Sequence, residues 1–279
     1  MKSSPLVWFI TGASQGFGLE LVRAALQRGD SVVATSRTPK KLEEIFPNTS
    51  DRLLALALDL HDPAAIEKAA ASALSKFGQI DFLVNNAGYG LLGTVEEASD
   101  AEVLEQFQIN FFGLLRVTRA VLPHFRERRS GHIVNISSMC GLTAWGGSGI
   151  YSATKFAVEG LSETLAEEVA PFGIRVMLVE PGGFRTNFLG DSLKLASNVI
   201  DDYTGTDADL RDWSKNRHGK QSGDPALAAQ AIIKAITSEK PPLHLLLGRD
   251  AYEEVTKKLD TLHHEIEEWR DMTLSMDFA

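Results

Sequence analysis

Seven short apolar runs alternate with stretches of helical periodicity along the whole chain. The runs are residues 6–11, 31–36, 53–58, 80–85, 132–137, 175–180 and 243–248. Each is apolar without a break, as a strand covered on both faces should be, rather than apolar at every second residue. Such strands joined by helices predict an α/β fold with a doubly wound, seven-stranded parallel sheet and helices on both faces.

The length and the helix boundaries agree with one domain. The chain has 279 residues, of which 44% are hydrophobic, enough for one sizeable core, so we predict a single domain over residues 1–279. Gly29 marks the end of the first helix, and Pro39 fits the first turn of the second. Asp-Pro pairs at Asp62 and Asp224 predict N-caps followed by proline at the first helical position. The run 99–122 predicts one long helix.

Two C-terminal segments need separate interpretation. Residues 187–223 fit neither period, and a connection this long predicts short helices with a substrate-binding or lid role, the alternative being a mobile surface insertion. In the last helix, residues 250–272, apolar residues recur at alternating steps of four and three. They are Val255, Leu259, Leu262, Ile266 and Trp269. We interpret this stripe as core packing in preference to a coiled-coil partner face.

Composition excludes several classes of protein. The chain carries 28 basic and 37 acidic residues, a net charge of −9 that disfavours nucleic acid as a partner. A single cysteine, Cys140, allows no internal disulfide and suits a reducing compartment. The apolar start is too short for a signal peptide or a membrane span, so we expect a cytoplasmic protein without a membrane partner. The histidines show no metal spacing, and we predict no metal site.

A glycine-rich turn follows the first predicted strand. "TGASQGFG" at residues 11–18 places Gly12, Gly16 and Gly18 where a backbone must turn sharply and let a pyrophosphate approach N–H groups at a helix N-terminus. The strand before it and the helix after it favour nucleotide binding over the alternative of a simple tight turn.

The end of the second strand indicates which nucleotide binds. An NAD-binding chain has an acidic residue there for the ribose hydroxyls. This chain has "ATSRTPKK", with Arg37 placed to pair with a 2′-phosphate, whereas Lys40 and Lys41 are expected to face solvent. We therefore predict NADP(H) in preference to NAD(H); the alternative is a solvated basic loop.

Six motifs in order carry a family resemblance. They are "TGASQGFG" at 11–18, "NNAG" at 85–88, "NFFG" from Asn110, "NISS" ending at Ser138, "YSATK" at 151–155 and "PGGFRT" at 181–186. Over roughly the first 190 residues the chain resembles the short-chain dehydrogenase/reductase family, which implies a single Rossmann-fold domain. Phe17 and Thr154 depart from the usual isoleucine and serine without removing a needed functional group.

The resemblance implies four catalytic residues: Asn110, Ser138, Tyr151 and Lys155. Tyr151 and Lys155 lie one helical turn apart, so the ammonium, together with the oxidised nicotinamide, would lower the pKa of the tyrosine and let it act as general acid and base. Lys155 would also hold the ribose hydroxyls, and Ser138 would hydrogen-bond the substrate oxygen, with strand alternation sending Ser137 to the opposite face. Asn110 would order a water that links the lysine to solvent; a helix-kink hydrogen bond is the structural alternative.

The resemblance also implies the residues that surround the cofactor. They are Gly12, Ser14, Gln15, Gly16, Phe17, Gly18, Arg37, Asp59, Leu60, Asn86, Ala87, Gly88, Tyr151, Lys155, Pro181, Gly182 and Thr186. Asp59 could equally cap the segment that follows it, and Cys140 is interpreted as pocket lining because no base that would activate its thiol is evident.

These residues favour an NADPH-dependent oxidoreductase that interconverts a small-molecule ketone or aldehyde and an alcohol. Two alternatives are a non-catalytic NADP(H)-binding regulator and a redox-neutral isomerase or dehydratase on the same fold. Four aromatic side chains, Trp145, Phe184, Phe188 and Trp213, favour a bulky apolar substrate. "PGGFRTNF" and "ATSR" resemble the 17β-hydroxysteroid dehydrogenase-like branch, and members of the family commonly form the homodimers or homotetramers that we expect here.

Overall fold

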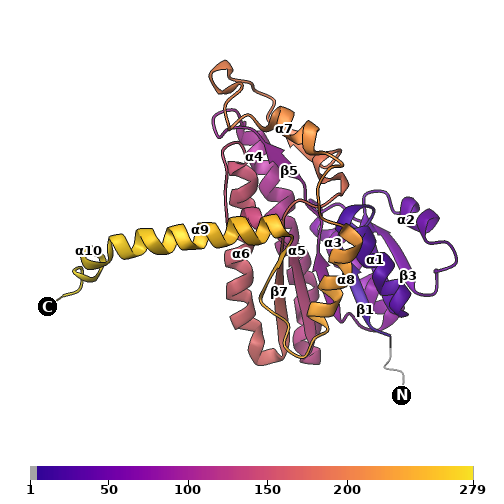
Figure 1. The fold of residues 1–279 in the computed structure, drawn as a ribbon. Coiled ribbons are helices and arrows are strands. Elements are labelled where there is room, and N and C mark those ends of the chain that lie inside the picture. Colours follow the sequence, from indigo (N-terminus) through magenta and orange to yellow (C-terminus); the bar gives the residue numbers. More distant parts are fainter. Residues whose placement is uncertain (1–4, 279) are drawn as a thin grey trace.

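Seven parallel strands form the main sheet of the computed structural model, which describes residues 5–278, in the order β3-β2-β1-β4-β6-β7-β9 (Figure 1). The strands are β1 (Val7–Ile10), β2 (Ser31–Ser36), β3 (Leu53–Ala57), β4 (Phe82–Asn85), β6 (Gly131–Ile136), β7 (Ile174–Pro181) and β9 (His244–Leu247). All seven predicted strands are present, and the predicted Rossmann-like α/β domain is confirmed.

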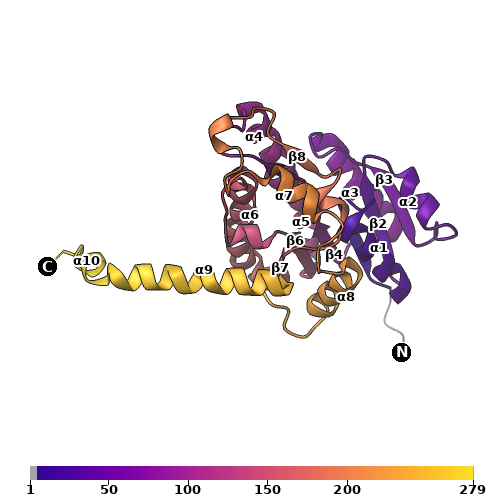
Figure 2. The same ribbon diagram turned by 45° about the horizontal axis from the view of Figure 1, so that its top comes forward.

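Helices cover both faces of the sheet, as Figure 2 shows. On one face, α1 (Gly16–Arg28) and α8 (Pro225–Ile236) pack on a core that includes Trp8 and Ile10 of β1. On the other, α3 (Pro63–Phe77), α5 (Leu114–Arg128) and α6 (Gly149–Val169) pack on a core that includes Phe9. Successive residues of one strand therefore enter two cores, which is why the strand sequences are continuously apolar.

The helix boundaries follow the predicted caps. Gly29 ends α1 with φ 93°, in the left-handed region that glycine tolerates. The side chain of Asp62 accepts hydrogen bonds from the N–H groups of Ala64 and Ala65 at the start of α3, and Asp224 caps α8 in the same way. Pro39 lies at the N-cap of α2 (Lys40–Ile45), one residue earlier than predicted.

The long helix predicted over residues 99–122 is interrupted. It consists of α4 (Asp100–Phe107), a π-helical segment η1 (Gln108–Gly113) and α5. Asn110 lies inside η1 and is buried. A π-helical segment inside an α-helix commonly marks a functional position, because it turns side chains out of the regular α-helical register.

The segment 187–223 contains the short helices that were predicted. They are η4 (Asn187–Leu189), η5 (Asp201–Tyr203) and α7 (Leu210–Arg217). Its strand β8 (Leu193–Leu195) pairs with β5 (Gly90–Leu92) as a separate two-stranded parallel sheet. Two further short helices are η2 (Met139–Gly141) and η3 (Ala170–Phe172).

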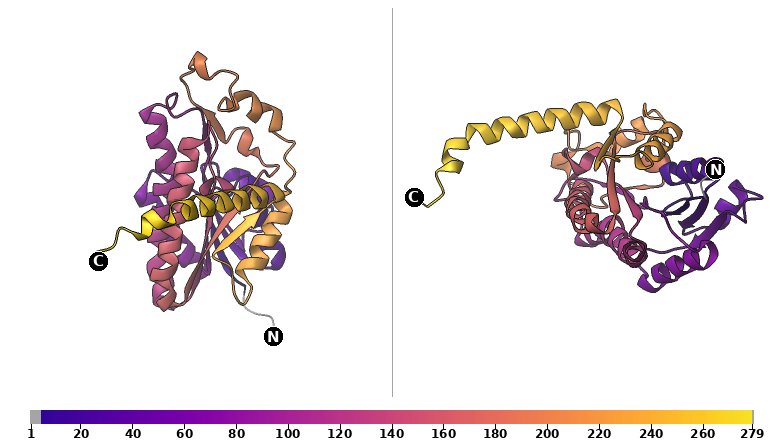
Figure 3. Two further views of the ribbon diagram at one scale, coloured as in Figure 1. Left: turned by 60° about the vertical axis from the view of Figure 1, so that its left-hand side comes forward. Right: turned by 90° about the horizontal axis from the view of Figure 1, so that it is seen from below.

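The interpretation of the C-terminal stripe as core packing is wrong for all but its first residue. Val255, near the start of α9 (Arg249–Glu268), is 2% exposed, but Leu259 is 56% and Trp269 62% exposed. Figure 3 shows α9 leaving the domain and projecting away from it, followed by α10 (Arg270–Leu274). Among the described residues, no helix is long and apolar enough to cross a membrane.

Candidate active site

The strand order reverses between β1 and β4, and the glycine-rich turn lies at this point, where ligands of open α/β sheets bind. Gly12 has φ +63°, and a Cβ built on it would lie 2.7 Å from the Cα of Ala87. A Cβ on Gly18 would lie 2.5 Å from Nδ2 of Asn86. Both positions therefore require glycine, because the turn after β1 packs directly against the turn after β4.

The N-terminus of α1 suits a bound pyrophosphate. Its N-cap residue, Gln15, makes no side-chain capping hydrogen bond, and the Nε2 of Gln15 donates instead to Oγ of Ser192 at 2.7 Å. The first N–H groups of α1 are thus left without a side-chain cap, at the positive end of the helix dipole. Together with the close-packed glycines, this geometry fits the phosphates of a dinucleotide.

Thr11, which sequence analysis did not single out, fixes the two turns relative to each other. Its Oγ1 accepts hydrogen bonds from the backbone N–H groups of Asn86 at 3.0 Å and Ala87 at 3.1 Å. The side-chain amide of Asn86 donates back to the carbonyl oxygens of Thr11 and Gly12. Thr11 directly follows β1 and precedes Gly12. A polar residue at the end of the predicted apolar run 6–11 was the signal that could have identified it.

The residues expected around the adenosine half lie at the ends of β2 and β3. Arg37 is exposed directly after β2, and Lys40 and Lys41 are exposed at the start of α2, as predicted. Asp59 is exposed, and its Oδ1 accepts from the N–H of His61 at 2.9 Å, so it does cap the turn that follows it. Leu60 is buried, and its carbonyl oxygen accepts from Arg116.

The structure brings the four predicted catalytic residues together. Asn110, Ser138, Tyr151 and Lys155 are all buried, with none more than 7% exposed. Nζ of Lys155 lies 5.8 Å from the ring centroid of Tyr151 and donates to the carbonyl oxygen of Ile136 at 2.8 Å. Oγ of Ser138 accepts from the N–H of Cys140 at 3.1 Å, which orients the hydroxyl at the end of β6.

Burial dominates the acidities of the catalytic pair. It raises the pKa of Tyr151 above its ordinary value, against a hydrogen bond with Ser138 that lowers it. Burial also lowers the pKa of Lys155 to about 8, against the attraction of Glu159. Burial therefore outweighs the lowering of the Tyr151 pKa by Ser138, and the phenol is protonated at neutral pH.

Asn110 uses its π-helical position to bridge two elements. Its Oδ1 accepts from the N–H of Tyr89 at 3.0 Å, and its Nδ2 donates to the carbonyl of Tyr89 at 2.9 Å and to Oγ1 of Thr154 at 3.2 Å. A Cβ built on Gly88 would lie 3.1 Å from Oδ1 of Asn110 and 3.9 Å from Nζ of Lys155. The buried amide is therefore satisfied and lies beside the lysine.

The turn after β7 is held by a residue that sequence analysis missed. Oδ2 of Asp250, in the first turn of α9, accepts from the N–H of Gly183 at 2.7 Å. A side chain at Gly182 would collide with the carboxylate of Asp250. Gly182 follows Pro181, the last residue of β7, and Thr186 lies 3.5 Å from the position of a Cβ on Gly16, so this turn faces the glycine-rich turn.

The segment 187–223 packs against Tyr151 through Phe188. The ring of Phe188 lies 5.6 Å from that of Tyr151, and Phe184 meets Phe17 edge to face at 5.1 Å. An ion pair at 3.2 Å between the partly exposed Arg211 and the buried Glu97 joins the segment to the region before α4. Of the four aromatic residues predicted at the pocket, Phe184 and Phe188 are partly buried, whereas Trp145 and Trp213 are exposed, 36% and 46%.

Two further features bear on the chemistry. Burial raises the pKa of the Cys140 thiol to about 11, which disfavours a thiolate and agrees with its interpretation as an unreactive residue.

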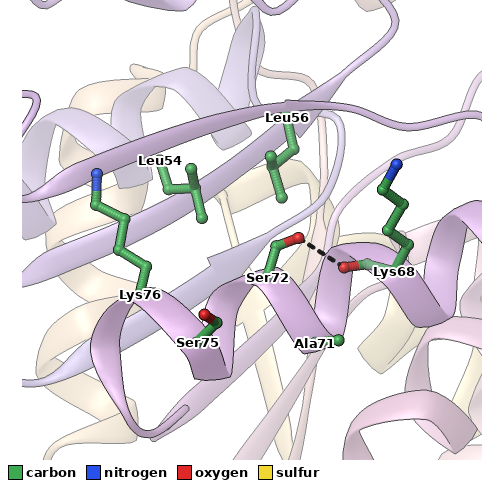
Figure 4. Close-up of a pocket in the computed structure, with 7 residues that line it drawn as sticks. All are labelled: Leu54, Leu56, Lys68, Ala71, Ser72, Ser75 and Lys76. Atoms are coloured by element: carbon green, nitrogen blue, oxygen red, sulfur yellow. Dashed lines mark hydrogen bonds between the residues drawn. The ribbon is translucent and has the colours of Figure 1, made fainter.

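A surface groove between β3 and α3 is lined by Leu54, Leu56 and Lys68 among others (Figure 4). Its lining residues include no acid, histidine or thiol and none of the four predicted catalytic residues.

A buried carboxyl pair lies one turn beyond Lys155. Glu159 on α6 and Glu180 on β7 are 4% and 0% exposed, and His244 on β9 approaches them, with Nδ1 at 2.8 Å from Oε1 of Glu180 and 3.7 Å from Oε2 of Glu159. Ligating atoms of all three lie within 4.8 Å of one another. The spacing rules that predicted no metal site could not find this set, because it draws on three separate elements.

This pair should give the stability of the protein a negative pH dependence. Burial raises the pKa of Glu159 to about 7 and that of Glu180 to about 8. Each carboxyl therefore stabilises the fold fully below the ordinary pKa of 4.5, and this stabilisation is lost as the pH rises through the raised values. The free energy of unfolding should fall between about pH 5 and about pH 8.5, and Glu159→Gln should make that fall smaller by at most about 3 kcal/mol. Unfolding in urea at several pH values in this range measures it.

Glu167→Gln is the matched control, since Glu167 lies two turns further along α6 and is exposed. It should leave the pH dependence of unfolding as in the unmodified chain. Equal slopes for Glu159→Gln and the unmodified chain would contradict the assignment.

The sequence and the structure are both similar to those of known proteins. Residues 6–194 match the family described as short chain dehydrogenase. Oxidoreductase BOA17 of Botryotinia fuckeliana is 37% identical over 270 residues, covering 96% of this chain and 98% of that protein. A crystal structure of a short-chain dehydrogenase from Streptomyces avermitilis is 43% identical with a TM-score of 0.92, covering 99% of this chain and 100% of that chain.

Solved neighbours include complexes with both nicotinamide cofactors. A serine dehydrogenase complexed with NADP+ is 30% identical with a TM-score of 0.74, covering 87% of this chain and 94% of that chain. A 3-ketoacyl-(acyl-carrier-protein) reductase from Brucella melitensis complexed with NADH is 26% identical with a TM-score of 0.72, covering 87% of this chain and 96% of that chain.

Proposed function

This chain belongs to the short-chain dehydrogenase family, and from this premise we propose that it interconverts a ketone or aldehyde and an alcohol with NADP(H). Tyr151 is the general acid and base in this proposal. The observation that carries it is the convergence of Asn110, Ser138, Tyr151 and Lys155 at one buried place beside the strand-order reversal.

A protonated Tyr151 suits the reductive direction at neutral pH. When bound, the reduced cofactor supplies the hydride. A phenol whose pKa is raised stays protonated over the neutral range, and Tyr151 can then give its proton to the carbonyl oxygen of the substrate. Ser138 hydrogen-bonds that oxygen and fixes its distance from the phenol.

Lys155 and Asn110 restore the proton that Tyr151 gives up. Burial lowers the pKa of Lys155 to about 8, so its ammonium can release a proton near neutral pH. In this proposal Asn110, on the π-helical segment, orders a water on the path from Lys155 to solvent. Lys155 also holds the ribose hydroxyls of the nicotinamide half.

Preference for NADP(H) over NAD(H) rests on Arg37. It follows β2 as an exposed side chain, and no carboxylate takes the place where an NAD-binding chain would hold the ribose. The planar guanidinium matches the oxygens of a 2′-phosphate.

The substrate is a bulky apolar carbonyl compound, and residues 187–223 form the lid of a single domain over residues 1–279. Phe188 covers Tyr151, so a substrate reaches the phenol only when this segment opens. "PGGFRTNF" and "ATSR" favour the 17β-hydroxysteroid dehydrogenase-like branch, which does not imply turnover of steroids.

The test is the consumption of NADPH and, separately, NADH, followed by absorbance with a panel of cyclic, long-chain and small polar ketones and aldehydes. Faster turnover of bulky apolar carbonyls with NADPH supports the proposal. Equal turnover of small polar ketones would contradict the substrate class. Tight NADPH binding without turnover of any carbonyl would favour the regulator or a redox-neutral reaction.

A further inference from the structure

The C-terminal helix α9 is anchored only at its base. Ala251 and Val255 are 0% and 2% exposed, and every described residue from 257 to 278 is exposed. In Figures 1 to 3 the yellow helix runs straight out beyond α6. A helix of 20 residues spans about 30 Å, so most of its length lies outside the domain.

One narrow face of this helix is apolar. We call it the α9 seam, formed by Tyr252, Val255, Leu259, Leu262, Ile266 and Trp269. The steps between successive residues are three, four, three, four and three, the a and d positions of a heptad repeat. A helix that packs on a sheet has a broader apolar face, whereas a 3.5-residue seam is the geometry of two helices wound together.

The exposed part of the α9 seam needs a covering surface. Leu259 and Ile266 are each 56% exposed and Trp269 is 62% exposed. Helices of this length take most of their stability from packing of an apolar face, and a contiguous exposed apolar patch marks an interaction site. The other faces carry six acidic residues against two lysines over residues 252–268, which disfavours an anionic membrane surface.

We propose that the α9 seam is covered by α9 of a second copy of this chain, antiparallel, about a two-fold axis between residues 260 and 261. Leu259 then packs against the partner's Leu262, and Leu262 against the partner's Leu259. Trp269 reaches the partner's Tyr252, which is 64% exposed at the base of its helix. An isologous pair of this kind is self-complementary, as two-fold symmetry requires.

Charge selects this register. Lys258 and Glu265 both occupy the g position that flanks the seam, seven residues apart. In the antiparallel pair the g positions of the two helices face each other, so Lys258 meets the partner's Glu265 and symmetry repeats the contact. Sliding one helix by a heptad would bring the two Glu265 side chains together.

A parallel pair is disfavoured by the domain itself. It would bring both domains to the same end of the helix pair, at the base of α9, where each helix is already buried against its own domain. The antiparallel arrangement puts the domains at opposite ends.

The first test is the molar mass of the full chain in solution, by sedimentation equilibrium, and it does not depend on the proposed enzymatic function. Leu262→Glu should halve the mass of the assembly, because it places a carboxylate in the central layer. Lys257→Glu, on the outward face of α9 between one and two turns earlier, should leave the mass unchanged. A monomeric unmodified chain, or an unchanged mass for Leu262→Glu with circular dichroism intact, would overturn the proposal.

The second test reverses the flanking charges. Lys258→Glu should weaken association about tenfold by placing like charges together. The double variant Lys258→Glu with Glu265→Lys should restore it, because the two g positions face each other only in this pairing. Failure of the double variant to recover would show that α9 meets a different surface, and would overturn the antiparallel pair.

Discussion

Tyr151→Phe is expected to lower kcat by about 10²- to 10⁴-fold, because it removes the proton that the carbonyl oxygen receives during reduction. The variant loses one hydroxyl and keeps the ring that packs against Phe188. The side chain is buried, and the Ser138 hydroxyl lies close enough to lower its pKa, so the substitution removes one polar group beside Ser138. The measurement is the steady-state consumption of NADPH with the best carbonyl substrate.

Binding of NADPH and thermal unfolding serve as controls for Tyr151→Phe. Both should stay near the values of the unmodified chain, since the phenol is not needed for the core or for the glycine-rich turn. A variant that keeps more than about a tenth of the activity would show that another group protonates the substrate.

Arg37→Asp is expected to weaken NADPH by about 10²-fold, because charge-assisted hydrogen bonds to the 2′-phosphate are replaced by repulsion. The affinity for NADH should change little or improve, since a carboxylate at this position can accept from the ribose hydroxyls. Isothermal titration of each cofactor measures both values. The reversal of preference is the diagnostic result, because general damage would weaken both cofactors alike.

Lys41→Asp is the matched control for Arg37→Asp. It makes the same change of charge four residues further on, in the exposed start of α2. Its effect on NADPH should be small and should shrink with added salt. If Lys41→Asp weakens NADPH as much as Arg37→Asp does, the 2′-phosphate is recognised by the general field of this loop.

The sheet was predictable because each strand is buried on both faces. Trp8 and Phe9 enter opposite cores, and both must therefore be apolar, which leaves a continuous run in the sequence. The glycine-rich turn was predictable for a related reason, since Gly12 and Gly18 meet backbone or side-chain atoms that exclude a Cβ. The positions of the catalytic residues came from the family resemblance, and the structure brings those residues together.

Three features were not accessible from the sequence. The narrow α9 seam fits two wound helices, but its spacing does not say where the helix leaves its own domain, so its exposure could not be predicted. The π-helical segment around Asn110 leaves no periodic signal of its own, because it lasts six residues. Glu159, Glu180 and His244 come from three elements, and only the sheet register brings His244 beside β7.

Asp250 links the projecting helix α9 to the turn after β7. It stands in the first turn of the projecting helix, and its carboxylate holds the N–H of Gly183 in the turn expected to meet the nicotinamide. The base of α9 cannot pivot without releasing that hydrogen bond. The buried base of α9 therefore holds the turn in one conformation, so part of the entropy cost of ordering the turn around a cofactor is met in advance.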